Sequence, residues 1–95
     1  MTDLSIEQRV ANGATWLDGR TPDWAILINP DALDIGDEHQ CVLGQVFGNY
    51  FDAPRDATVA SDGIYLANQR GFSTVKFDDL EPLAEAWRAA VAARR

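Results

Sequence analysis

The last quarter of the chain carries the pattern that most constrains the fold, which is a set of large apolar residues recurring every three or four positions. They are Leu80, Leu83, Trp87 and Val91. Residues at this spacing share one face of an α-helix. The pattern predicts a final amphipathic helix, capped by Asp78 or Asp79, that buries this face against the rest of the chain. Pro82 falls in the first turn, where a missing N–H costs little.

The start of the chain predicts a second helix of the same kind. Ser5 can cap it, and Gln8, three residues later, completes a capping box. Apolar side chains then recur at helical spacing, at Ile6, Val10, Ala14 and Leu17. After Asp18, we expect Gly19 to end the helix in the left-handed conformation that glycine adopts easily.

Two shorter elements follow. Residues 21–24 (TPDW) are typical of a helix start, with Thr21 as the cap. The apolar segment from Trp24 to Ile28 predicts one or two turns that are mostly buried. Residues 31–38 (DALDIGDE) then form a carboxylate-rich connector in which we expect Leu33 and Ile35 to be buried.

A third helix is predicted from about Glu38 to Phe47, with Asp37 and Gln40 as its capping pair. Most of its circumference is apolar, so we place it at the centre of the fold, packed by the first and last helices. Gly48 is expected to end this helix. Gly44 is expected to mark a close contact with a neighbouring segment.

The stretch from 50 to 63 has the weakest signals, with turns predicted at 54–56 and at Asp62-Gly63. A short helix is predicted over 64–69, ended by Gly71. Residues 73–77 favour an extended loop, because one strand without a partner forms no sheet. Residues 1–95 therefore predict a single all-α domain, a compact bundle of four or five short helices.

Acidic residues concentrate in the middle of the chain. The net charge is −7, from 15 acidic and 8 basic residues, and the segment from Asp18 to Asp62 holds nine carboxylates against two arginines. An acidic surface is repelled by phosphate backbones and anionic lipids, so direct binding to nucleic acid or membrane is disfavoured. The sequence has neither an N-terminal signal pattern nor a run of roughly 18 apolar residues. We therefore expect a cytoplasmic protein.

Four carboxylates follow one another closely in the connector, at Asp31, Asp34, Asp37 and Glu38. A calcium loop of the EF-hand type needs oxygen ligands at alternating positions and a glycine at the sharp turn. Here the spacing is mostly three, with apolar residues between, so we assign these side chains to capping and solubility rather than to a metal. The phosphate-loop and dinucleotide motifs are missing too. The sequence predicts no metal site and no cofactor.

His39 and Cys41 are the residues that would most naturally carry catalysis. His39 is expected in the first turn of the third helix, as a surface or half-buried structural residue. Cys41 has apolar neighbours, which favours a small buried core residue over a nucleophile. Two residues apart on one helix, the two side chains would point in different directions. We therefore expect no catalytic site and no enzyme.

Aromatic side chains supply the candidates for a binding surface. Trp16 lies one position off the apolar face of the first helix, so it is the aromatic residue that we expect to be partly exposed. Tyr50 and Phe51, in the loop from Tyr50 to Asp56, form a second candidate patch. Tryptophan and tyrosine dominate the residues that contribute most to protein interfaces. Together with the acidic connector, these residues are the predicted protein-binding positions.

Three motifs follow one another along the chain: LDxxxPxW from Leu17 to Trp24, CVLGQ from Cys41 to Gln45, and Gly71-Phe72 before the last helix. With these motifs the chain resembles a group of small uncharacterised proteins from actinobacteria and their bacteriophages. The resemblance covers nearly all of the sequence, although the segment from Arg55 to Asn68 departs from the pattern. It implies a bacterial host or phage origin, and it brings no assigned activity.

The leading functional hypothesis is a phage or prophage-type accessory protein that binds a bacterial host protein without catalysis. One form of it is an acidic mimic of nucleic acid, in which the connector carboxylates occupy a basic site on a host enzyme. The second hypothesis is a structural or assembly protein that associates with itself into a homo-oligomer.

Overall fold

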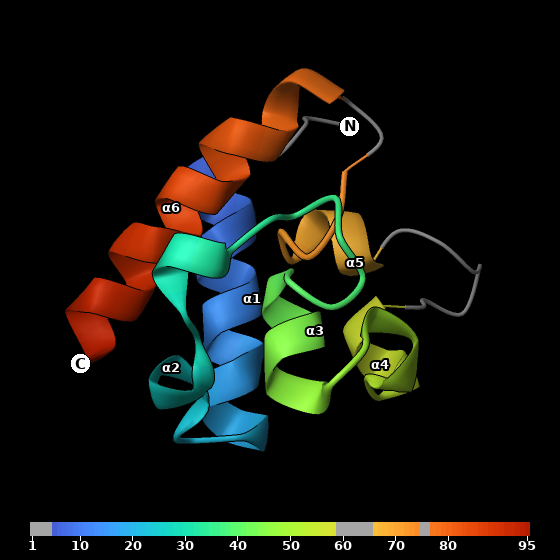
Figure 1. The fold of residues 1–95 in the computed structure, drawn as a ribbon, viewed down its shortest axis with the longest axis vertical. Coiled ribbons are helices and arrows are strands. Elements are labelled where there is room, and N and C mark those ends of the chain that lie inside the picture. Colours follow the sequence, from blue (N-terminus) through green and yellow to red (C-terminus); the bar gives the residue numbers. More distant parts are fainter. Residues whose placement is uncertain (1–4, 59–65, 75–76) are drawn as a thin grey trace.

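The computed structural model describes residues 5–58, 66–74 and 77–95. Two 15-residue helices, α1 (Ile6–Arg20) and α6 (Leu80–Arg94), pack against each other and make the most extensive contact between elements (Figure 1). The other helices have six residues or fewer: α2 (Trp24–Leu27), α3 (Val42–Phe47), α4 (Arg55–Thr58) and α5 (Leu66–Gln69). Single 3-10 turns cover Pro30–Ala32, Tyr50–Asp52 and Phe77–Asp79.

The all-α class predicted from the sequence is confirmed, since the described ranges contain helices and no β-strand. α5 contacts α1, and α2 contacts both α6 and α3. None of the helices in these ranges combines the length and the apolar character needed to cross a membrane.

α1 begins as the capping signal predicts and ends one residue later than expected. The Ser5 hydroxyl accepts a hydrogen bond from the backbone N–H of Gln8 at 3.1 Å. The predicted end at Gly19 is wrong, because the helix runs to Arg20 and Thr21 caps it. The N–H of Thr21 donates to the Leu17 carbonyl at 2.7 Å, so no left-handed residue is needed there.

The apolar face of α6 is buried as predicted. Leu83, Trp87 and Val91 are almost fully enclosed, and Leu80 is partly buried. Asp79 occupies the cap position, but its side chain forms no capping hydrogen bond.

α2 is buried on one side only. Trp24, Ala25 and Ile28 belong to the core, whereas Ile26 is 69% exposed and Leu27 is 52% exposed. The prediction of a mostly buried segment is wrong for these two residues, because a single turn resting on α6 and α3 keeps a face towards solvent. The cap residue is Asp23 rather than Thr21.

α3 is shorter than predicted, because it begins at Val42 rather than near Glu38. The Asp37 carboxylate accepts hydrogen bonds from the N–H groups of His39 and Gln40, which holds that stretch in a turn. Cys41 then caps the helix. The predicted central position between the first and last helices is also wrong, since α3 mainly contacts α2 and the Tyr50–Asp52 turn, whereas α1 and α6 pack directly against each other. Gly48 ends α3 in the left-handed region, at φ 93°, as expected.

The later segments agree in part with the sequence. α5 falls within the predicted short helix, and Gly71, at φ 70°, follows it. Residues 54–56, predicted as a turn, instead lead into α4. The turn predicted at Asp62-Gly63 lies outside the described residues.

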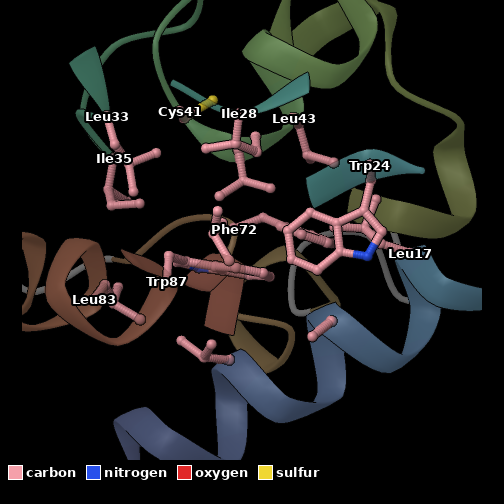
Figure 2. Close-up of a cluster of buried hydrophobic side chains, with 14 of the residues drawn as sticks. Leu17, Trp24, Ile28, Leu33, Ile35, Cys41, Leu43, Phe72, Leu83 and Trp87 are labelled. Atoms are coloured by element: carbon pink, nitrogen blue, oxygen red, sulfur yellow. The ribbon is translucent and has the colours of Figure 1, made fainter. Parts of the chain in front are cut away.

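Three aromatic rings form the middle of the core (Figure 2). Trp87 stacks on Phe72 with ring centres 5.6 Å apart, and Trp24 meets Trp87 edge-on at 5.7 Å. Leu33 and Ile35 are buried, as predicted for the connector. The connector is thereby fixed against the core while its carboxylates remain outside.

Candidate functional site

An open groove of about 590 Å³ lies where the acidic connector, the turn at Tyr50–Asp52 and the segment after α5 meet. Two carboxylates (Asp37, Glu38) and two aromatic residues (Tyr50, Phe51) line it, together with Ile35, Gly36, Cys41, Phe72, Ser73, Thr74 and Leu80. We refer to this feature as the acidic groove. The groove brings together the acidic connector and the loop that begins at Tyr50, which the sequence suggested as two separate binding surfaces.

The two carboxylates stand in solvent on a turn with fixed geometry. One Asp37 oxygen accepts the N–H groups of His39 at 2.7 Å and Gln40 at 3.1 Å. The Glu38 side chain is half-exposed, with a carboxylate oxygen 3.7 Å from Nε2 of His39. Because these two hydrogen bonds hold the Asp37 carboxylate against the backbone turn, the negative charge of Asp37 has a fixed position in the groove.

A backbone hydrogen bond joins the acidic turn to the aromatic turn. The N–H of Tyr50 donates to the carbonyl of Glu38 at 2.7 Å. The Asn49 side chain accepts the N–H of Phe51 at 2.8 Å and so caps the 3-10 turn. These two bonds fix the aromatic pair beside the carboxylates.

Phe51 is the most exposed large apolar side chain of the described residues, at 76%. Its ring meets that of the half-buried Tyr50 edge-on, at 5.3 Å between ring centres. Leu80, also in the lining, is partly buried, whereas Phe72 is fully enclosed in the core. An exposed aromatic ring next to partly exposed apolar side chains is an arrangement found at protein interfaces.

Three of the seven predicted binding residues lie outside the lining of the acidic groove. Asp31 and Asp34 are exposed on the connector, where an Asp34 oxygen accepts the N–H of Gly36 at 3.0 Å. Trp16 is half-buried, as expected, and packs edge-on against Phe47 and Phe72. The guanidinium groups of Arg20 and Arg70 each lie 5.6 Å from the Trp16 ring.

Cys41 is a core residue, as the sequence predicts, with 1% of its surface exposed. Burial raises the pKa of its thiol, against the lowering effect of the hydrogen bond that the sulfur accepts from the Gly44 N–H at 3.3 Å. The thiol is therefore protonated near neutral pH and is a poor nucleophile.

His39 is exposed and lies in the turn before α3, so its predicted place in the first helical turn is wrong. Its Nδ1 is 3.2 Å from the carbonyl oxygen of Gly48. The imidazole is exposed to solvent, whereas the Cys41 thiol is buried in the core. Within the described ranges, no three acidic, histidine or cysteine side chains gather at a spacing that could hold a metal ion.

Sequence reasoning missed the exposed pair Ile26 and Leu27. The signal was present, because all four residues of α2 (WAIL) are apolar and a single helical turn cannot bury its whole circumference. The pair forms a second apolar surface, on a different element from the acidic groove.

A scan against protein-family models and searches of curated proteins and of solved structures each found no match.

Proposed function

We propose that this protein acts by binding another protein, without catalysis, and that the acidic groove is the docking surface. The observation that carries the proposal is the 76% exposure of Phe51 in a groove that also presents the partly buried Tyr50 and two carboxylates. Leaving a phenylalanine in water forgoes about 1.5–3 kcal/mol of burial free energy. A partner that covers the ring recovers that free energy.

A bacterial host protein is the proposed partner, with the chain acting as a phage or prophage-type accessory protein. This part of the proposal is supported by the resemblance of its three sequence motifs to actinobacterial and phage proteins. The absence of catalysis is supported by the buried thiol of Cys41, whose pKa is raised by burial, while the imidazole of His39 is exposed to solvent.

The test is a tagged pull-down from nuclease-treated actinobacterial lysate with three versions of the chain. Phe51→Ser removes the exposed ring of the groove, and Ile26→Ser removes a similarly exposed apolar side chain from α2. We expect one stoichiometric protein with the wild type and with Ile26→Ser, and its loss with Phe51→Ser. Equal recovery by all three, or recovery of the bait alone, would contradict the proposal.

Self-association is the second candidate function, and the exposed Ile26 and Leu27 favour it. Two copies that pair through α2 would cover both side chains. Light scattering at low micromolar concentration should then report a defined oligomer that the double variant Ile26→Ser/Leu27→Ser converts to a monomer. A monomeric wild type would exclude this candidate.

A further inference from the structure

We infer that the acidic groove takes a cationic and apolar segment of its partner, in which an arginine or lysine stands next to an aromatic or aliphatic side chain. The inference rests on the proposed function and names the chemistry of the occupant. The basic group would face Asp37 and Glu38, and the apolar side chain would cover Phe51.

Charge complementarity is the first argument for this occupant. Among its described lining residues, the groove has two carboxylates and no basic side chain. The exposed carboxylates of Asp31 and Asp34 stand on the same connector and add to the negative potential. Such a field attracts basic segments and repels acidic ones, which sets specificity and association rate more than affinity.

The apolar lining is the second argument, because carboxylates alone would suit any cation. The Phe51 ring is open to solvent, and two further apolar side chains of the lining, Tyr50 and Leu80, are only partly buried. An aliphatic or aromatic side chain gains burial there, and a guanidinium group can also stack on an aromatic face. A partner segment that carries both a basic and an apolar side chain can contact the carboxylates and the apolar side chains of the groove at once.

The groove also has the size of a peptide site. Its volume of about 590 Å³ fits a few side chains of one segment rather than the face of a whole domain. Peptide recognition of this kind relies on one or two anchor side chains supported by flanking charges. The occupant is therefore expected to keep its specificity as an isolated short peptide.

The test selects binders from a library of random peptides about twelve residues long, a length typical of short linear motifs. Asp37→Asn/Glu38→Gln removes both charges, and the amide oxygen that replaces the Asp37 carboxylate can still accept the backbone N–H groups that hold the turn. Asp23→Asn/Glu85→Gln makes the same change of net charge at exposed positions outside the groove. Phe51→Ser removes the aromatic anchor.

We expect the enriched peptides to pair arginine or lysine with an aromatic or aliphatic residue. A representative synthetic peptide should bind the charge variant at least about 10-fold more weakly, and the control variant within about 2-fold of wild type. Its affinity should also fall as salt rises from about 50 to about 500 mM, because exposed charges are screened. Phe51→Ser should abolish binding.

Two sets of results overturn different claims. Enriched peptides without basic residues, or an affinity that the charge variant leaves unchanged, would overturn this inference and leave the groove as a docking surface. A failure to enrich any peptide, or binding that survives Phe51→Ser, would overturn both.

Discussion

The indole nitrogen of Trp87 donates a 2.7 Å hydrogen bond to the carbonyl oxygen of Gly71, sixteen residues earlier in the chain. Trp87 is fully buried and stacks on Phe72, the residue that follows Gly71 (Figure 2). The bond therefore ties α6 to the segment that supplies Phe72, Ser73 and Thr74 to the acidic groove.

Trp87→Phe should lower the free energy of unfolding by about 2–4 kcal/mol. The smaller ring leaves a cavity and removes the donor for the Gly71 carbonyl, and both effects destabilise the folded state. Urea unfolding followed by circular dichroism measures the change. An unchanged unfolding midpoint would show that the bond and the stacking contribute little.

Two glycines should respond to alanine in opposite directions. A Cβ atom on Gly44 would collide with the Glu38 carbonyl oxygen and lie 2.6 Å from the His39 carbonyl carbon, so Gly44→Ala should cost more than about 2 kcal/mol. A Cβ on Gly19 meets nothing within 4 Å in α1. Because alanine favours helix, Gly19→Ala should stabilise by up to about 1 kcal/mol. Thermal unfolding of both variants measures the two changes in stability. An unchanged melting temperature for Gly44→Ala would contradict the close packing of Gly44 against the backbone of Glu38 and His39.

The Cys41 thiol should react with a disulfide reagent at least about 100-fold more slowly in the folded protein than in urea. Burial encloses the sulfur and raises the pKa of the thiol, and only the thiolate attacks. Absorbance stopped-flow at mildly alkaline pH measures both rates. Rapid reaction of the native protein would contradict the burial of the sulfur and would make Cys41 a candidate nucleophile again.

The ion pair between Asp18 on α1 and Arg94 on α6, 2.9 Å apart, should make a small pH-dependent contribution to stability. The hydrogen bond from Arg94, followed by that from the Trp24 indole, lowers the pKa of Asp18 below its usual 3.8. The stabilisation is therefore present above pH 3.8 and is lost as the pH falls through the lowered pKa.

Asp18→Asn should cost less than about 1 kcal/mol at neutral pH, because both side chains are partly exposed and screened by solvent. The difference from wild type should shrink towards zero in acid. Denaturant unfolding across pH 2–7 follows it. A difference that persists at the lowest pH would assign the effect to neutral hydrogen bonding instead.

Local sequence signals were sufficient for the two long helices. The apolar spacing in α1 and α6 and the Ser5 cap act within a few residues, so they are readable without the fold. The errors have two causes. One is local, because the Asp37 side chain accepts the N–H groups of His39 and Gln40 and holds residues 38–40 in a turn, so α3 begins later than predicted. The other is tertiary contact, because α2 rests on two neighbours that leave Ile26 in solvent.

The parts of the candidate site were predictable, but their assembly was not. Asp37, Glu38, Tyr50 and Phe51 were each singled out from composition and pattern. Their meeting in one groove depends on the bond from the Tyr50 N–H to the Glu38 carbonyl, which joins residues twelve positions apart. The exposure of Phe51 depends on the Asn49 cap that fixes the turn beneath it.

Site-specific photo-crosslinking tests the docking surface most directly. A benzophenone amino acid is placed at position 51 in the acidic groove or, as a control, at exposed position 85 on α6. Both proteins are irradiated in nuclease-treated actinobacterial lysate. We expect one defined adduct from position 51, which excess wild-type protein suppresses and which position 85 does not form. Equal adducts from the two positions, or none from position 51, would contradict it.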